Sequence, residues 1–194
     1  MRSVGWTIPS ELERLRELAW EVPAECAIVE IGSYLGESAI ALARGAADGA
    51  GAPRVHCVDP WIGPTPGTTG QDPLNLGTGD AWYAAFLDNI EIAGVADQIT
   101  VHRETSAEAA SRWTAEQPIG LLFIDAVHDY DPILQDYTLW SPYVVEAGWL
   151  AFHDFSSGFP DTERVINEHV LPSGLWSRVK LTNSLWTAQR LPNT

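Results

Sequence analysis

The sequence predicts an α/β fold, in which a doubly wound, mostly parallel sheet has helices on both faces and an antiparallel strand near its C-terminal end. Short apolar segments alternate with helical patterns along most of the chain. The first of these segments, residues 27–31, closes on a glycine, as buried strands often do. The last two segments, 177–181 and 185–190, are separated only by Asn183 and its neighbours, which can form a hairpin turn and so add the antiparallel strand.

Each element follows from its own pattern. The expected strands span residues 27–31, 55–59, 99–102, 119–125, 148–153, 177–181 and 185–190. The first helix lies within the N-terminal segment 1–24, where Ser10 and a glutamate three residues later predict an N-cap and Pro23 predicts the end. The later helices are expected at 38–44, 81–94, 106–113, 132–140 and 162–169. Residues 61–80 are rich in proline, glycine and threonine and predict a long, lid-like loop, and loops of this length are usually functional or disordered.

Composition restricts the class of protein. A chain of 194 residues fits one domain, 1–194. Its formal net charge of −15, from 26 acidic and 11 basic residues, disfavours nucleic acid and membrane surfaces as partners. No apolar run is long enough to cross a bilayer, and the N-terminus lacks a signal-peptide pattern, so we expect a cytoplasmic protein. Cys26 and Cys57 lie in apolar segments and are expected to be reduced core residues.

Polar or acidic groups follow each of the first five predicted strands. They lie in the segments 30–38, 59–61, 104–106, 125–130 and 153–154. In open α/β sheets, ligands bind beyond the carboxyl ends of the strands, so this pattern predicts a functional site at that edge. Asp59, at the end of the second strand, is placed to accept hydrogen bonds from ribose hydroxyls.

The loop after the first strand differs from two common phosphate-binding motifs. Tyr34 breaks the dinucleotide pattern Gly-x-Gly-x-x-Gly, and Glu37 occupies the lysine position of a P-loop. What remains is an acid-x-Gly-x-x-x-Gly pattern formed by Glu30, Gly32 and Gly36. The two glycines permit close approach of a ligand to the backbone, and the carboxylate suits a cationic or amino-bearing ligand.

These motifs resemble those of a known enzyme family. Residues 29–38, Val-Glu-Ile-Gly-Ser-Tyr-Leu-Gly-Glu-Ser, resemble the first motif of the class I S-adenosylmethionine-dependent methyltransferases, which have a Rossmann-like seven-stranded sheet. Segments 57–61, 86–89, 106–108, 122–130 and 148–154 resemble the metal-dependent small-molecule O-methyltransferases. These include the catechol enzyme, the macrolide-sugar O-methyltransferases and proteins known as cephalosporin hydroxylases. The resemblance covers about residues 26–190.

The resemblance implies a set of cofactor-binding residues. They are Glu30, Gly32, Ser33, Gly36, Ser38, Asp59, Trp61, Ser106 and Asp125. Glu30 and its loop would line the methionine end of S-adenosylmethionine, and Asp59 would hold the ribose. Trp61 would cover the adenine or the substrate. Ser106, which also has the features of a helix N-cap, would lie beside the adenine.

The resemblance also implies a metal site and a base. Asp125 and Asp154 would bind a divalent cation, with Mg²⁺ expected and Mn²⁺ as the alternative. His153 stands where the relatives have an acid, and whether it ligates is open. If it does, the site favours manganese, iron or zinc. Asp125 and His128 are the implied catalytic residues, with His128 as the general base because its ordinary pKa of about 6.5 allows proton transfer near neutrality.

The expected reaction is methyl transfer to a hydroxyl of a small molecule, either a sugar or a catechol-like diol, assisted by the metal. Two other classes remain open. His128 and His153 with one carboxylate could form the two-histidine face of an iron hydroxylase-like enzyme. The chain could also be a non-catalytic cofactor-binding protein. Only one short helix precedes the sheet, which leaves room for a homo-oligomer whose neighbouring subunit covers the substrate.

Overall fold

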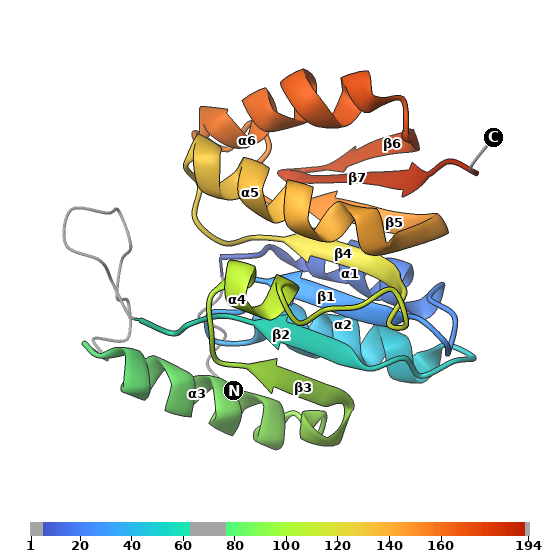
Figure 1. Ribbon diagram of the computed structural model, residues 1–194. Helices are drawn as coiled ribbons and strands as arrows, with labels where there is room; N and C mark the ends of the chain where they lie inside the picture. The colour runs from blue at the N-terminus through green and yellow to red at the C-terminus, as the bar shows by residue number, and fades with distance from the viewer. Residues whose placement is uncertain (1–5, 63–76, 193–194) are drawn as a thin grey trace.

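A computed structural model describes residues 6–62 and 77–192. Its sheet has seven strands in the order β3-β2-β1-β4-β5-β7-β6 (Figure 1). The strands are β1 Ala27–Ile31, β2 Val55–Val58, β3 Ile99–His102, β4 Ile119–Ile124, β5 Val144–Phe152, β6 Trp176–Thr182 and β7 Leu185–Arg190. Strand β7 pairs antiparallel with both β5 and β6, and the other strand pairs in this sheet are parallel. The predicted Rossmann-like, mostly parallel sheet with an antiparallel C-terminal strand is confirmed.

Helices cover both faces of the sheet. They are α1 Pro9–Trp20, α2 Glu37–Asp48, α3 Gly79–Ile92, α4 Ser106–Ala110, α5 Tyr130–Trp140 and α6 Pro160–Val165, with a π-helical turn at Ile166–Val170 and short 3₁₀ turns at Ala96–Gln98, Ser141–Tyr143 and Leu171–Ser173. Helices α1 to α3 pack on one face, and α4 to α6 pack on the other. Successive strand residues point to opposite faces, so Ile28 and Val29 belong to different cores.

The central strands position the site. Every residue of β1, β2 and β4 is buried, as expected for strands that are covered on both faces. The chain runs from β1 outward to β2 and β3, and then returns to place β4 on the other side of β1. The loops after β1 and β4 therefore diverge to opposite faces. A crevice at such a switch point is where open α/β sheets bind their ligands.

The beginning of α1 differs from the prediction. Ile8 is the N-cap, and Pro9 takes the first helical position, where a missing N–H costs nothing. Glu11 accepts a hydrogen bond from the Ile8 N–H at 3.1 Å. The predicted cap at Ser10, paired with Glu13, is therefore wrong, because the proline fixes the helix start two residues earlier.

Three further expectations can be placed on the fold. Cys26 and Cys57 are free and buried, as predicted. Within 6–62 and 77–192, no helix combines the length and the apolar character needed to span a membrane. Most of the predicted lid-like loop 61–80 lies outside the described residues, and α3 already begins at Gly79.

Candidate active site

Two acid-bearing loops meet at the carboxyl ends of β1 and β4, on the left side of the sheet in Figure 1. The Gly32 N–H donates to the Val58 carbonyl at 2.9 Å, and the Asp125 N–H donates to the Ile31 carbonyl at 2.8 Å. Gly32 has a φ of 88°, and a Cβ at this position would lie only 2.3 Å from the Asp125 carbonyl oxygen. The two loops are thus in backbone contact at a point where only glycine fits.

Asp59 holds the glycine loop in shape. Its Oδ2 accepts hydrogen bonds from the N–H groups of Ser33 and Tyr34, both at 3.0 Å, and its Oδ1 accepts from the Trp61 N–H at 2.7 Å. Burial raises the pKa of Asp59, and these three hydrogen bonds oppose that shift. A carboxylate has about four lone-pair positions, so little capacity is left for a ligand. The predicted contact of Asp59 with a ribose stays a prediction.

Glu30, in strand β1, supports the same loop. Its side chain is 0% exposed and accepts hydrogen bonds from Ser33 Oγ at 2.5 Å and from the Cys57 thiol at 3.4 Å. Burial raises the pKa of Glu30 to about 7, although hydrogen bonds from Ser33 and the buried Ser38 oppose the shift. The predicted place of Glu30 at the methionine end of the cofactor stays a prediction. Glu30 contacts the loop through Ser33, while Gly36, with a φ of 88°, is the N-cap of α2.

Two residues that are predicted to contact the cofactor have partners within the protein. Trp61 is 2% exposed, donates from Nε1 to the Tyr34 carbonyl at 2.7 Å and packs 4.7 Å from the Phe86 ring. Trp61 belongs to the core cluster, and its predicted place over the adenine or substrate stays a prediction. Ser106 Oγ accepts from Trp140 Nε1 at 2.9 Å. The N-cap of α4 is Thr105 and not Ser106, and the adenine contact of Ser106 stays a prediction.

On the β4–β5 side, three side chains converge. Ligand atoms of Asp125, His128 and Asp154 all lie within 4.8 Å of one another. His128 Nε2 lies 2.6 Å from Asp154 Oδ2 and 3.8 Å from Asp125 Oδ1. This buried nitrogen forms an ion pair with Asp154 but no hydrogen bond among the described residues. An unsatisfied nitrogen beside two carboxylates is a donor set that suits a divalent cation.

The charges in this cluster are strongly coupled. Burial lowers the pKa of His128, but the carboxylates of Asp125 and Asp154 outweigh it and raise that pKa to about 9. Burial conversely raises the pKa of Asp154, and His128 and His153 outweigh it and lower that pKa. Without a cation, His128 therefore carries a proton at neutral pH and cannot accept another. A bound cation would take over the role of this proton, since metal binding and protonation compete at such sites.

His153 lies behind the two carboxylates. Its side chain is buried, with Nδ1 at 3.2 Å from Asp154 Oδ2 and 3.5 Å from Asp125 Oδ1. Its Nε2 lies 3.2 Å from Glu11 Oε2. Burial lowers the pKa of His153, but Asp125 and Asp154 outweigh it and raise that pKa to about 11. Both ring nitrogens thus have carboxylate partners. His153 stands outside the group of three, and its role as a metal ligand stays a prediction.

Sequence reasoning missed three residues of this cluster. Ser157 Oγ donates to Asp154 Oδ1 at 2.7 Å, and the Phe159 ring stacks on His128 with centroids 4.4 Å apart. Glu11 is the third, 142 residues before its partner His153. One signal could have found it: Glu11 precedes Leu15 by four residues and Leu18 by seven, so it lies on the buried face of α1.

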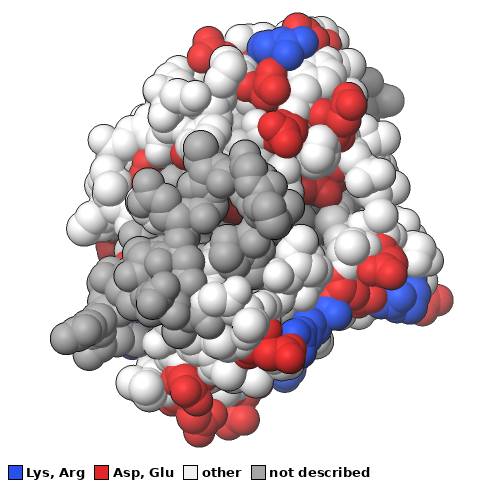
Figure 2. Space-filling model, turned by 90° about the vertical axis from the view of Figure 1, so that its left-hand side faces the viewer, with Lys and Arg blue, Asp and Glu red and all other residues white. Residues whose placement is uncertain are grey.

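Acidic side chains predominate on the face formed by the carboxyl ends of the strands (Figure 2). In the described loops that follow β1 to β5, the one Lys or Arg is Arg103. Its guanidinium pairs with Asp80 and lies over the Tyr83 ring, with 4.5 Å to the centroid. The described surroundings of the cluster therefore present no unpaired cationic side chain to an anionic ligand.

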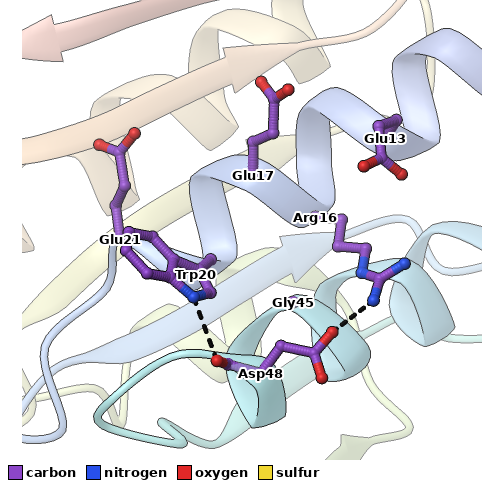
Figure 3. A pocket seen from close by; sticks show the side chains of 7 residues that line it. All are labelled: Glu13, Arg16, Glu17, Trp20, Glu21, Gly45 and Asp48. Atoms are coloured by element: carbon purple, nitrogen blue, oxygen red, sulfur yellow. Dashed lines mark hydrogen bonds and ion pairs between the residues drawn. The ribbon is translucent and has the colours of Figure 1, made fainter.

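A hollow between α1 and α2 is separate from this site (Figure 3). It is lined by Glu13, Arg16, Glu17, Trp20, Glu21, Gly45 and Asp48. Arg16 pairs with the Asp48 carboxylate, and Trp20 Nε1 donates to the Asp48 carbonyl at 3.1 Å. These residues lie toward the C-terminal ends of both helices, whereas α2 begins beside the candidate site.

Comparison with known proteins points to one family. The family described as a methyltransferase domain matches residues 29–155. No curated protein matches the chain. Among solved structures, the O-methyltransferase NovP is similar with a TM-score of 0.71 and 16% identity, over 94% of this chain and 80% of that chain. TomG from Streptomyces achromogenes, an O-methyltransferase involved in tomaymycin synthesis and solved in complex with SAM, has a TM-score of 0.68 and 16% identity, over 96% and 82%. Cofactor-bound Rv0187 from MTB has a TM-score of 0.68 and 19% identity, over 98% and 84%.

Proposed function

Because this chain belongs to the methyltransferase domain family and is a class I S-adenosylmethionine-dependent methyltransferase, we propose that it methylates a hydroxyl group of a small molecule with the help of a divalent cation. The observation that carries this proposal is the convergence of Asp125, His128 and Asp154 within 4.8 Å, beside the glycine loop. The O-methyltransferases among the structurally similar proteins agree with a hydroxyl acceptor.

The proposed cation would be held by Asp125 and Asp154, with Mg²⁺ or Mn²⁺ suited to their oxygen ligands. A bound cation of this kind supplies a Lewis acid that lowers the pKa of a substrate hydroxyl. The unsatisfied Nε2 of His128 supports this assignment, since it lies beside both carboxylates without a hydrogen bond among the described residues. With the carboxylate charges compensated, the pKa of His128 falls from about 9, and Nε2 becomes free to accept the hydroxyl proton.

The glycine loop would hold the methyl donor. Gly32 and Gly36, both with a φ of 88°, shape a turn that Asp59 fixes through the N–H groups of Ser33 and Tyr34. The contact between Gly32 and the Asp125 carbonyl brings this loop directly to the proposed cation site. Such fixed positioning of two reactants contributes much of the acceleration in methyl transfer, up to roughly 7–11 kcal/mol when alignment is good.

The acceptor class follows from charge. Phosphate groups are usually bound by Arg, Lys or backbone N–H groups. The described loops after β1 to β5 offer only Arg103, which is already paired with Asp80. We therefore infer a neutral or amine-bearing acceptor, such as a sugar or a diol, in preference to a nucleoside diphosphate sugar.

The test is calorimetry followed by an activity assay. Purified protein is titrated with S-adenosylmethionine and with Mn²⁺, and methyl transfer is then measured on catechol and on simple glycosides, with and without a chelator. Binding of both ligands, together with chelator-sensitive methylation of at least one hydroxyl acceptor, is expected. Methyl transfer that is indifferent to chelation would remove the cation from the proposal, and cofactor binding without transfer to any acceptor would favour a non-catalytic role.

The His128→Ala variant separates two roles of this histidine. A large loss of turnover with unchanged Mn²⁺ affinity identifies a base, and a loss of Mn²⁺ affinity identifies a ligand. The iron hydroxylase alternative needs two histidine ligands and one carboxylate, whereas the group of three contains one histidine and two carboxylates.

A further inference from the structure

We propose that Glu11 is a positioning residue of the active site, which fixes the carboxylates of Asp125 and Asp154 through the ring of His153. Helix α1, which lies outside the β1–β5 part of the fold where the other site residues are found, thereby completes the site. This inference rests on the proposed function, because these two carboxylates are the ones proposed to hold the cation.

The contacts form a continuous chain. Glu11 is 1% exposed, and its Oε2 lies 3.2 Å from His153 Nε2. On the other side of the ring, Nδ1 lies 3.2 Å from Asp154 Oδ2 and 3.5 Å from Asp125 Oδ1. An imidazole ring gripped at both nitrogens cannot rotate, so it presents Nδ1 to both carboxylates in a fixed direction. Carboxylates orient metal-binding histidines in other proteins by the same kind of contact, and here the oriented ring would in turn position the two carboxylates.

Glu11 is itself held from two directions. Oε1 accepts hydrogen bonds from the Ser184 N–H at 2.8 Å and from Ser184 Oγ at 2.7 Å. Oε2 accepts from the Ile8 N–H at 3.1 Å as well as facing His153. Four donors thus occupy the roughly four lone-pair positions of the carboxylate. The start of α1 and the turn between β6 and β7 together fix the position of its oxygens.

The backbone around Asp154 shows why this region needs to be held. Asp154 has a φ of 62°, in the left-handed region that non-glycine residues rarely adopt. On either side of it, the His153 N–H donates to the Ile124 carbonyl at 3.1 Å and the Phe155 N–H donates to the Ser184 carbonyl at 3.0 Å. The β6–β7 turn therefore supports both the backbone after Asp154 and the carboxylate of Glu11.

Stability alone does not explain a glutamate here. Glu11 lies on the same face of α1 as Leu15 and Leu18, both of which are 0% exposed. Burying a carboxylate costs several kcal/mol before its partners repay it, and replacing buried ion pairs by apolar residues is often neutral or stabilising. Capping of α1 requires only the Ile8 N–H contact. The contact with His153 has no role in capping the helix. It connects Glu11 to the carboxylates of Asp125 and Asp154.

The test compares Glu11→Gln with Glu13→Gln, a matched change at an exposed position of the same helix. Calorimetry with Mn²⁺ and, separately, with S-adenosylmethionine gives two affinities for each protein. We expect Glu11→Gln to bind Mn²⁺ at least tenfold more weakly than wild type. Its kcat should fall by a larger factor than its KM for the substrate changes. Its affinity for S-adenosylmethionine should stay within twofold, and Glu13→Gln should match wild type throughout.

A Glu11→Gln variant with wild-type Mn²⁺ affinity and turnover overturns this inference alone. Wild-type protein that binds no Mn²⁺ overturns the proposed cation site and the inference with it, so the two failures are distinguishable. Should Glu11→Gln fail to fold, Ser184→Ala decides the question, since it removes the hydroxyl that donates to Glu11 at 2.7 Å and lies 3.5 Å from His153 Nε2, and it keeps the backbone N–H donor. We expect a two- to fivefold weaker Mn²⁺ affinity for Ser184→Ala, and an unchanged affinity would contradict the inference.

Discussion

The two halves of the site use the same residue types in opposite ways. On the β1–β2 side, both oxygens of Asp59 accept hydrogen bonds from backbone N–H groups, whereas the completely buried Glu30 accepts from Ser33 and Cys57 through Oε2 alone, and its Oε1 has no hydrogen-bond partner among the described residues. On the β4–β5 side, Asp125 and Asp154 crowd against His128, whose buried Nε2 lacks a hydrogen bond among the described residues.

This difference separates acids that hold a loop in shape from acids that are suited to bind a ligand or transfer a proton. An acid whose oxygens are satisfied by backbone N–H groups fixes the shape of a loop but has little capacity left for a ligand. Acids that face one another across a histidine shift its pKa strongly, and strongly shifted pKa values are typical of groups that bind ions or transfer protons. An acid at the end of a strand is therefore a poor guide to function until its partners are known.

The largest expected effect comes from Asp154→Asn, which tests whether the β4–β5 half carries the chemistry. Removing one of the two carboxylates should lower kcat/KM by at least roughly 10³-fold, about 4 kcal/mol of transition-state stabilisation. Affinity for S-adenosylmethionine should remain within threefold by calorimetry. Asp129→Asn, at an exposed neighbouring acid, is the control. Equal losses in both variants would show that the cluster has no special role.

Gly32→Ala should disturb both the glycine loop and the proposed cation site, because this glycine lies against the Asp125 carbonyl. A methyl group there meets backbone at 2.3 Å and the residue must keep a φ of 88°. We expect the free energy of unfolding in urea to fall by more than about 2 kcal/mol, with weaker binding of both Mn²⁺ and S-adenosylmethionine. Gly94→Ala is a matched control, since Gly94 has a φ of 70° but nothing within 4 Å of the added Cβ. A similar loss in both variants would assign the effect to backbone strain alone.

Glu30→Gln sharpens the comparison through pH. The pKa of Glu30 is raised to about 7 in the fold, from an ordinary value of 4.5, by burial. A raised pKa gives stability that is fully present below pH 4.5 and is lost as the pH rises through 7, up to roughly 3 kcal/mol for this difference. We therefore expect urea unfolding to show a smaller loss of stability between pH 5 and pH 8 in Glu30→Gln than in wild type. Glu25→Gln, at an exposed position, should behave as wild type.

The smallest effect is expected for Asp59→Asn, which asks whether the halves are independent. An amide keeps only one acceptor oxygen, so the Trp61 N–H or the pair from Ser33 and Tyr34 loses its partner. We expect affinity for S-adenosylmethionine to fall about 10- to 30-fold, close to 1.4–2 kcal/mol, with Mn²⁺ affinity unchanged. A parallel loss of Mn²⁺ affinity would mean that the two halves act as one unit.

Local patterns predicted the frame of the fold well. The alternation of apolar segments and helices fixed the seven strands, and the hairpin at Asn183 correctly indicated the antiparallel strand. The patterns failed where neighbouring residues were both suited to start a helix. Helix α1 begins at Pro9 and not after Ser10, and the N-cap of α4 is Thr105 and not Ser106. Caps depend on which residue first adopts helical backbone angles, and the sequence pattern alone does not settle that.

By itself, the sequence determined where acids, glycines and histidines stand relative to strand ends, since burial and turn chemistry act over a few residues. Only the tertiary structure decided which of these groups have partners. The burial of Glu30 and Trp61, and the contact of His153 with Glu11 across 142 residues, depend on packing between distant segments. A buried polar group forms hydrogen bonds with the donors or acceptors that the fold brings near it. These partners can be far away in the sequence, so local sequence patterns do not identify them.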